Sequence, residues 1–389
     1  MVEFSPYAYE FHEDPYPLYR RLREEAPVYH DAEMGFWALS RYADVLAAFK
    51  DPKRFSNAHG VSIEPSARGP VARTGLSFLA MDPPEHTRFR SLVSRGFTPR
   101  RVDALEPRVR EITVKHLDGL VGSGGFDVIA DFTGKLPMDV ISEMLGVPEA
   151  DRADLRAWAD TMVHREEGIL DIPSEGVAAF GRIRSYFVDA IAMRRSEPGD
   201  DLLSALISLD ADRSLSDGDL LAFCNLMVTA GNETTTKLLA NALYWLWRHP
   251  EQRALVQNDP ALIPSWVEET LRYDNSTQAL MRVTLEDVEV RGVTIPAGEY
   301  VLLLVGSANR DPEAFERPDD YDIRRDTSAM LSFGKGTHFC MGASLARLEA
   351  RVAFEEWWKR FPGYEVQPDG IERVHSVNVR GFAALPIAI

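Results

Sequence analysis

The longest hydrophobic pattern in the chain runs from residue 217 to residue 247. Apolar side chains recur on nearly every side of this segment, which predicts a helix that is buried all round. Ser216 followed by Asp219 is typical of a capped helix start, and His249-Pro250 ends the segment because proline cannot continue a helix. At 1.5 Å per residue, the helix is about 45 Å long. It is therefore long enough to cross the whole protein.

A polar break interrupts this apolar segment at its centre, where residues 230–236 read Ala-Gly-Asn-Glu-Thr-Thr-Thr. Glycine costs a helix roughly 1 kcal/mol relative to alanine, and buried polar groups are costly unless they are paired. One interpretation is an internal polar network in which threonines bond to the preceding turn. The other is a groove in which Ala230 and Gly231 leave room for reactants while Glu233 and Thr234 relay protons.

The rest of the pattern predicts many helices and a smaller β-rich part. Helical periodicity dominates residues 101–207, with a break at 169–174, and shorter helices are expected at 14–23 and 41–49. Residues 28–30 and 36–39 predict a hairpin, and residues 281–305 are rich in strand formers. Residues 59–78 predict a loop that is too long for an ordinary connection. We expect one mainly α-helical domain that spans residues 1–389.

Composition limits the possible partners and the compartment. The net charge is −17, which disfavours nucleic acid and anionic membranes as partners. The two cysteines, Cys224 and Cys340, do not suggest a disulfide framework, so a reducing compartment is expected. We find no leader segment and no run of roughly 18 apolar residues that predicts a membrane span. We therefore expect a cytoplasmic monomer.

A glycine-rich loop delivers one cysteine to the start of a predicted helix. Residues 333–342 read Phe-Gly-Lys-Gly-Thr-His-Phe-Cys-Met-Gly, and helical spacing follows from residue 343. Cys340 therefore lies where helix dipoles and unpaired N–H groups favour the thiolate, which is the form that binds metal. Glycines let a flat group lie against the loop backbone, and haem with a cysteine-ligated iron is such a group. The alternative is a small buried cysteine in a turn.

The segment resembles the haem-binding signature of the cytochrome P-450 family. The matching positions are Phe333, Gly334, Gly336, His338, Cys340 and Gly342. The resemblance covers nearly the whole chain and implies the P-450 fold, with the long helix over a haem and the cysteine loop beneath it. It implies haem b as cofactor and Cys340 as the only protein ligand of the iron. Cys224, among apolar neighbours, is expected to serve packing.

The resemblance also assigns roles to other charged residues. His86 and Arg90 follow Pro83-Pro84 and share a helix face, which by spacing alone is typical of a solvated surface. The family match implies instead that both bind the haem propionates together with Arg282, since buried carboxylates need charged partners. Glu233 and Thr234 match the acid-alcohol motif of the family.

Glu269 and Arg272 match the family's buried Glu-x-x-Arg pair, which braces the core near the cysteine loop. Relatives often complete this pair with a later arginine, but Asp320 stands at the corresponding position here. Arg317 or Arg324 is expected to replace it.

The implied pocket is roofed by residues 59–78, so Val61, Ile63 and Leu76 are candidate substrate contacts, and Gln278 lies in a second lining segment. The implied reaction inserts one atom of O2 into a small apolar substrate. Electrons are expected from NAD(P)H through a ferredoxin and its reductase, because the chain shows no dinucleotide- or flavin-binding fingerprint.

A local basic patch is expected to receive that ferredoxin on the cysteine side of the protein. Its expected members are Arg95, Arg100, Arg101, Arg347 and Arg351. Two other classes stay open. One is a peroxide-driven or non-oxygenase haem-thiolate enzyme, against which the Glu233-Thr234 pair argues, and the other is a haem-based sensor, which would need an output domain.

Overall fold

The computed structural model describes residues 2–209 and 215–389. The α-helices are α1 (Tyr9–Glu13), α2 (Tyr16–Glu25), α3 (Tyr42–Lys50), α4 (Ala72–Leu76), α5 (Glu85–Val93), α6 (Pro99–Ala104), α7 (Glu106–Asp118), α8 (Leu136–Leu145), α9 (Arg152–Val163), α10 (Ser174–Ser196), α11 (Leu202–Ile207), α12 (Asp217–Arg248), α13 (Pro250–Asn258), α14 (Ile263–Tyr273), α15 (Val305–Ala308) and α16 (Ala343–Arg360). The strands are β1 (Val28–Asp31), β2 (Phe36–Leu39), β3 (Phe55–Ser56), β4 (Gly125–Asp127), β5 (Ala279–Thr284), β6 (Val288–Val290), β7 (Val293–Ile295), β8 (Tyr300–Leu304), β9 (Glu365–Val366), β10 (Glu372–Arg373), β11 (Phe382–Ala384) and β12 (Pro386–Ala388). The expected class, mainly α with a smaller β-rich part, is confirmed.

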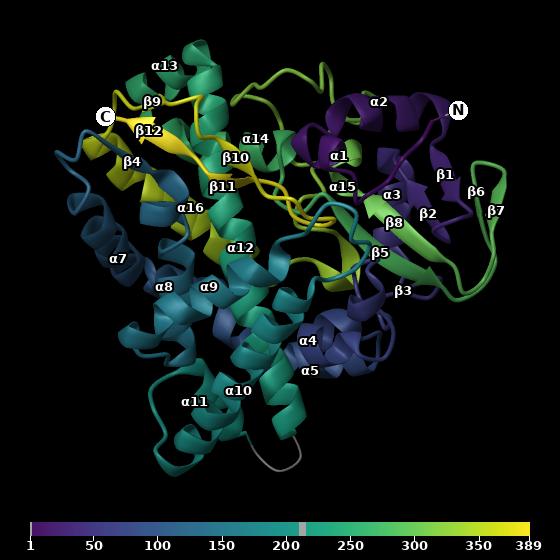
Figure 1. Ribbon diagram of the computed structural model, residues 1–389, viewed down its shortest axis with the longest axis horizontal. Helices are drawn as coiled ribbons and strands as arrows, with labels where there is room; N and C mark the ends of the chain where they lie inside the picture. Colours follow the sequence, from purple (N-terminus) through teal and green to yellow (C-terminus); the bar gives the residue numbers. More distant parts are fainter. Residues whose placement is uncertain (1, 210–214) are drawn as a thin grey trace.

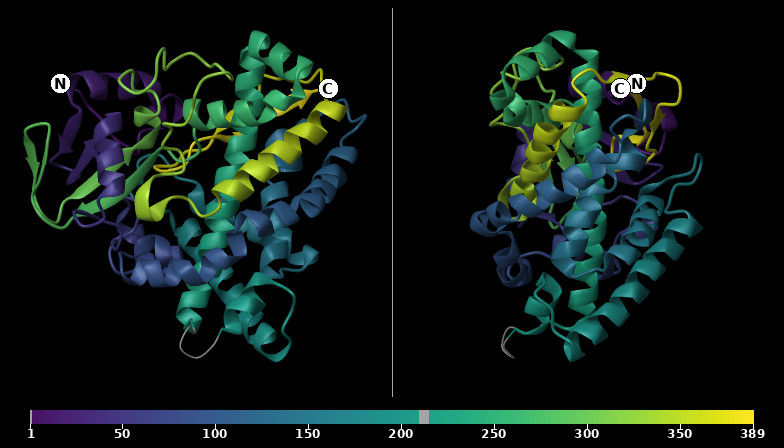
Figure 2. Two further views of the ribbon diagram at one scale, coloured as in Figure 1. Left: turned by 180° about the vertical axis from the view of Figure 1, so that it is seen from behind. Right: turned by 90° about the vertical axis from the view of Figure 1, so that its left-hand side faces the viewer.

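The long helix α12 runs through the centre of the molecule, and most other helices pack around it (Figure 1). Its predicted start is confirmed: Ser216 Oγ accepts a hydrogen bond from Asp219 N at 3.1 Å, and Asp219 Oδ2 accepts one from Ser216 N at 3.2 Å. The helix ends at Arg248, directly before His249-Pro250. On the reverse side, α7 and α16 lie side by side (Figure 2).

The β-rich part lies to one side of this helical body (Figure 1). Its main sheet has the order β1-β2-β8-β5-β3, and the predicted hairpin is the antiparallel pair β1–β2. Strand β8 is central, with Leu303 opposite Leu39 in parallel β2 and opposite Leu280 in antiparallel β5. Leu303 and Leu39, which are buried, and Leu280, which is partly buried, thus pack across neighbouring strands of the sheet. Residues 59–78, predicted as one long loop, contain α4 and short 3₁₀ turns at Pro65–Ala67 and Ser77–Ala80, so that prediction is corrected to a connection with short helical pieces.

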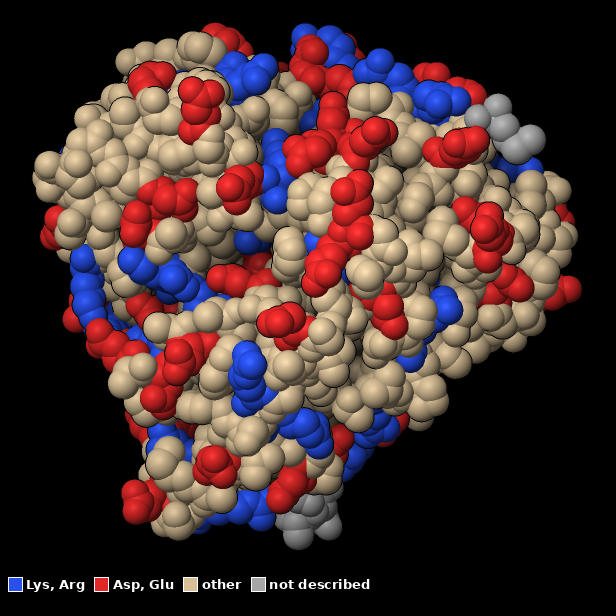
Figure 3. Space-filling model, viewed as in Figure 1, with Lys and Arg blue, Asp and Glu red and all other residues tan. Residues whose placement is uncertain are grey.

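A large apolar core surrounds α12 and extends to α14 and α16, where Trp266 and Trp357 are fully buried. On the face drawn in Figure 3, acidic and basic side chains are interspersed, so this face carries no extended basic surface of the kind that binds nucleic acid. Within the described residues, no helix is both long and apolar enough to cross a bilayer.

Candidate functional site

The cysteine loop is fixed by tight backbone contacts. Gly334 and Gly336 have positive φ angles of 66° and 72°, and a Cβ at Gly336 would lie 2.6 Å from the carbonyl oxygen of Phe49. Cys340 N donates to Phe333 O at 2.9 Å, which closes the loop. Helix α16 begins at Ala343, three residues after the cysteine, as predicted from the spacing. Only glycine fits at position 336, so this part of the pattern has a steric cause.

The thiol of Cys340 is reachable from solvent and is otherwise surrounded by protein. Burial raises the pKa of the Cys340 thiol, whereas the backbone N–H of Gly342, the guanidinium groups of Arg90 and Arg347, and the N–H of Ala343 lower it. Two backbone N–H groups and the charges of two nearby arginines therefore favour the thiolate, a setting that suits a sulfur with a metal ion beside it. Burial and the charge of Asp201 both raise the pKa of the Cys224 thiol, and no group lowers it, so this second cysteine has no such setting.

Four basic side chains converge near this loop. The rings of His86 and His338 lie 4.1 Å apart between centroids, and Arg90 Nη2 donates to Phe339 O at 2.5 Å. Arg282 is 3% exposed and donates only to the carbonyl oxygen of Met281, at 2.7 Å. Among the described residues none of the four forms an ion pair, and the ring nitrogens of both histidines are buried without a hydrogen-bond partner.

This cluster is electrostatically unbalanced. Burial is the first cause that lowers the pKa of His86 to about 4, of His338 to about 2 and of Arg282 to about 10. Both imidazoles are therefore neutral at pH 7, whereas Arg282 keeps a buried charge that has no anionic partner among the described residues, and nearby carboxylates would favour the charged form of all three side chains. A planar ring with two carboxylates, whose iron accepts a thiolate, therefore fits the donor set: Cys340 for the metal, and His86, Arg90, Arg282 and His338 for the carboxylates. These are residues that the sequence assigned to haem.

Helix α12 loses burial locally at its centre. From Leu220 to Leu243 every residue of α12 is buried except Thr229, Ala230, Gly231 and Thr234. Ala230 and Thr234 are four residues apart and so share one side of the helix. Gly231 has a packing reason as well, because a Cβ there would lie 2.9 Å from the side chain of Ile141 in α8. The polar break thus includes both an unburied surface at Ala230 and Thr234 and a close helix contact at Gly231.

Thr234 and Glu233 point to different surroundings. Thr234 Oγ1 donates to Ala230 O at 2.8 Å, as expected if the threonines bond to the preceding turn of the helix. The same oxygen can still accept a hydrogen bond from another donor. Glu233 is buried, with Asn232 Nδ2 at 3.2 Å and Lys237 Nζ at 3.5 Å from its carboxyl oxygens. Burial raises the pKa of Glu233 to about 8, while Lys237 lowers it. The carboxyl of Glu233 therefore binds a proton more readily than an exposed glutamate does.

Lys237 is a partner that the sequence reasoning missed. It is 3% exposed, and its stem packs against Gly381, where a Cβ would lie 2.6 Å from it. A lysine one turn after Glu233 inside an apolar helix was the available signal, because a buried ammonium needs a carboxylate at this spacing.

Glu269 and Arg272 form the expected buried pair, with Arg272 Nη2 to Glu269 Oε1 at 2.7 Å and both side chains fully buried. The expected third partner is corrected. Arg317 pairs with Asp320 at the surface, Arg324 forms no ion pair among the described residues, and Arg325 instead reaches Glu269 at 3.4 Å. The physical reason is the turn after Tyr321, since Asp322 N also donates to Glu269 Oε1 and places Arg325 within reach.

This network continues to the cysteine loop. Arg272 Nη1 donates to Asn309 O at 3.0 Å, and Asn309 Oδ1 accepts from Leu331 N at 2.8 Å. Ser332 Oγ accepts from Asn309 Nδ2 and donates to Leu271 O at 2.6 Å. The residues directly before Phe333 are therefore tied to α14, which positions the loop.

The candidate substrate contacts are dispersed. Ile63 is buried in the apolar cluster of the β-rich part, and Leu76 packs at the edge of the main core. Val61 is buried, and its carbonyl oxygen accepts from Met281 N at 2.8 Å. Gln278 Nε2 donates to Asn275 O at 2.7 Å. The structure brings Val61 next to β5 and gives Ile63 a role in the core.

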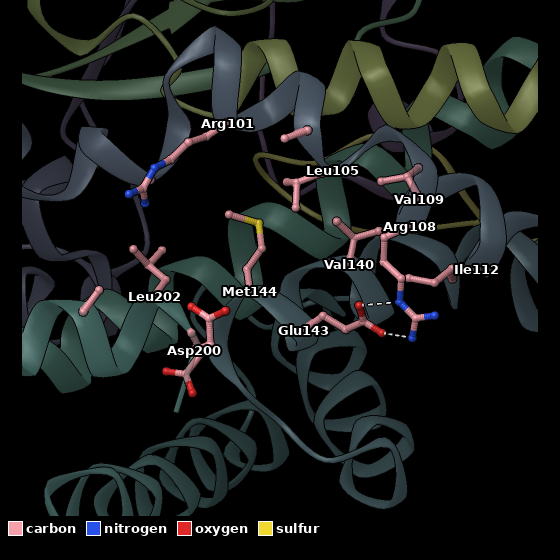
Figure 4. Close-up of a pocket in the computed structure, with 14 residues that line it drawn as sticks. Arg101, Leu105, Arg108, Val109, Ile112, Val140, Glu143, Met144, Asp200 and Leu202 are labelled. Atoms are coloured by element: carbon pink, nitrogen blue, oxygen red, sulfur yellow. Dashed lines mark hydrogen bonds and ion pairs between the residues drawn. The ribbon is translucent and has the colours of Figure 1, made fainter. Parts of the chain in front are cut away.

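A separate cavity of about 420 Å³ lies between α6, α7, α8 and α11. Figure 4 shows Arg108 bonded to Glu143 at its rim, while Leu105, Val140 and Met144 line it. None of the residues assigned to the haem site lines this cavity.

Comparison with known proteins agrees with this geometry. The sequence model of the family described as Cytochrome P450 matches residues 179–262 and 261–374. The chain is 55% identical over 388 residues to cytochrome P450 123 of Mycobacterium tuberculosis, covering 99% of this chain and 96% of the relative. It is 42% identical over 389 residues to vitamin D(3) 25-hydroxylase of Pseudonocardia autotrophica, covering 97% and 94%.

Among solved structures, CYP109E1 of Bacillus megaterium in complex with testosterone matches with a TM-score of 0.90 at 32% identity, covering 97% of this chain and 98% of that one. Sequence, fold and the unbalanced basic cluster beside Cys340 lead to one conclusion. The chain belongs to the cytochrome P450 family, as a haem-thiolate monooxygenase whose cofactor is iron protoporphyrin IX.

Proposed function

We propose that this protein inserts one oxygen atom of O2 into a small apolar organic molecule, while the second atom leaves as water with two protons and two electrons. The observation that supports the proposal best is the setting of Cys340, where two backbone N–H groups and two nearby arginines favour the thiolate, in a chain whose helix α12 leaves Ala230 and Thr234 unburied. When bound, a haem with a thiolate ligand supplies O2 activation, because electron donation from sulfur favours O–O cleavage.

In this proposal Cys340 is the ligand of the iron, and His86, Arg90, Arg282 and His338 hold the propionates. Phe333 lies under the guanidinium of Arg347, at 4.5 Å from the ring centroid, which fixes one wall of the loop. Thr234 accepts a hydrogen bond from a water molecule, because its own proton is already donated to Ala230 O. Glu233, whose burial raises the pKa of its carboxyl, relays protons toward Thr234.

The electrons are proposed to come from NAD(P)H through a ferredoxin and its reductase. The expected basic patch separates into two groups. Arg347 and Arg351 are paired with Glu268 at 2.6 Å and Glu106 at 2.5 Å. By contrast Arg95, Arg100 and Arg101 are exposed, and none forms an ion pair within the described part of the chain. We therefore propose that an acidic ferredoxin docks against these three free arginines.

The test is the coupling of NAD(P)H consumption to product in the reconstituted enzyme, with peroxide quantified in parallel. We expect Thr234→Ala to bind haem and substrate but to release peroxide in place of product, and Glu233→Gln to slow the coupled reaction. Thr229→Ala is the matched control, since Thr229 Oγ1 also bonds back into α12, to Asn225 O at 2.9 Å. Unchanged coupling in both test variants would make the polar break structural. Product formed from peroxide alone, at an equal rate, would favour the peroxide-driven class.

A further inference from the structure

Three segments that are far apart in the sequence meet at one buried ion pair. Glu64 belongs to residues 59–78, and Arg165 belongs to the connection between α9 and α10. Arg165 N donates to the carbonyl oxygen of His375, in the C-terminal segment, at 2.9 Å. The side chains of Arg165 and Glu64 are only 9% and 1% exposed. A pair of full charges is thus enclosed where three segments join.

The partners of both charges are supplied by the protein. Arg165 Nη2 donates to Glu64 Oε2 at 3.0 Å, and Arg165 Nε donates to Glu64 Oε1. The remaining guanidinium nitrogen donates to Met162 O at 2.7 Å and His164 O at 2.8 Å. Ser62 Oγ donates to Glu64 Oε2 at 2.6 Å and lies 2.8 Å from Asn378 Oδ1. Both charges are neutralised only while the segments are together.

A second polar contact joins residues 59–78 to the α9–α10 connection, at the surface. Ser66 donates to Asp171 from its N at 2.9 Å and from its Oγ at 2.7 Å, in an exposed position. Exposed contacts of this kind exchange with water at little cost, whereas a buried charge without its partner is strongly disfavoured. Closure of the segments therefore depends on Glu64 and Arg165 both being present.

We infer that Glu64 and Arg165 form a latch that controls substrate access. The latch holds residues 59–78 against the α9–α10 connection and opens each time a molecule enters or leaves. The inference rests on the proposed function, because it places the pocket beneath residues 59–78. Glu64 and Arg165 are positioning residues in this scheme and take no part in bond making.

Hydrogen exchange of the haem-loaded protein measures the latch without using activity. In Glu64→Gln and in Arg165→Gln, one charge stays buried without its partner. We therefore expect the amides of residues 60–70 and 165–172 to exchange about tenfold faster or more, while the exchange rates of core amides stay unchanged. The double variant Glu64→Leu/Arg165→Met buries no charge, and its exchange should return to within about threefold of wild type. Glu149→Gln, which removes the exposed pair with Lys115, is the control.

Stopped-flow binding of 4-phenylimidazole, a neutral apolar iron ligand, gives the second readout. Both association and dissociation rates should rise about tenfold in the single variants and revert in the double variant. If a single variant fails to fold, Arg165→Lys keeps the charge but loses the two-point contact, and the same increase is expected. Wild-type exchange in the single variants, or exchange that rises equally across the whole protein, overturns the latch. Absence of any spectral response would refute the proposed function, while the exchange data would still decide on the latch.

Discussion

Arg272→Met tests how strongly the buried network beneath the cysteine loop stabilises the protein. The guanidinium is fully buried and makes five hydrogen bonds: two to Glu269, at 2.8 and 2.7 Å, and one each to the carbonyl oxygens of Asn309, Pro318 and Asp320. Methionine has a similar length but no charge. The substitution leaves the Glu269 carboxylate buried with Asp322 N and the more distant Arg325 as its remaining partners.

Removing one member of a buried ion pair typically costs about 3–5 kcal/mol, which is a large part of the roughly 5–15 kcal/mol by which a native protein is stable. For an m-value of about 4 kcal/mol/M in urea, suited to a chain of this size, the midpoint of unfolding should fall by about 1 M. Because Asn309 links Arg272 to Leu331 and Ser332, release of haem should begin at lower urea than loss of helix.

The assay is urea unfolding of the haem-loaded protein, followed by haem absorbance and by far-UV circular dichroism. Two probes are needed because a protein with a bound cofactor need not unfold in one step. Arg317→Met removes an exposed pair with Asp320 and is the matched control, for which little change is expected. Glu269→Met/Arg272→Met removes both charges and should recover at least half of the loss. Equal midpoints for Arg272→Met and Arg317→Met would refute the reasoning.

Three further predictions concern single sites. The ferrous carbon monoxide complex should show the red-shifted band of thiolate ligation, and Cys340→His should move it to a histidine-like position, whereas a retained thiolate band would exclude Cys340 as the ligand. Burial raises the pKa of the Glu349 carboxyl from 4.5 to about 8. Between these two pH values the folded state holds a proton that the unfolded state has lost. The free energy of unfolding therefore declines by about 1.4 kcal/mol per pH unit as the pH rises from 4.5 to 8. Glu349→Gln should abolish that part of the decline in unfolding curves at pH 6 and 8, and an unchanged slope would contradict the assignment. Arg100→Glu should slow reduction by an acidic ferredoxin and weaken its salt dependence, with Arg351→Glu as the paired arginine for comparison; equal effects would place the docking face elsewhere.

Much of the fold was predictable because its signals are local. The capping residues Ser216 and Asp219, the apolar run that follows and the stop at His249-Pro250 define α12 within one residue of its observed end, since each acts through its immediate neighbours. The glycine loop before α16 is equally local: Gly336 is needed because of a backbone contact, and the loop carries a family signature. The single-domain organisation, the roles of individual site residues and the substrate stay predictions.

The tertiary structure decided which charged residues from distant segments form ion pairs. The sequence alone determined that Cys340 precedes a helix, that α12 is buried and polar at its centre, and that His86, Arg90 and Arg282 are candidates for one site. It could not show that Arg325, and neither Arg317 nor Arg324, reaches Glu269, because that choice depends on the path of a turn. Nor could it show that Glu64 meets Arg165 across 101 positions of sequence. Helix caps and glycine turns depend on neighbours a few residues away. The partner of a buried charge depends instead on how remote segments pack, and the spacing of residues along the chain does not show which remote side chains come within bonding distance.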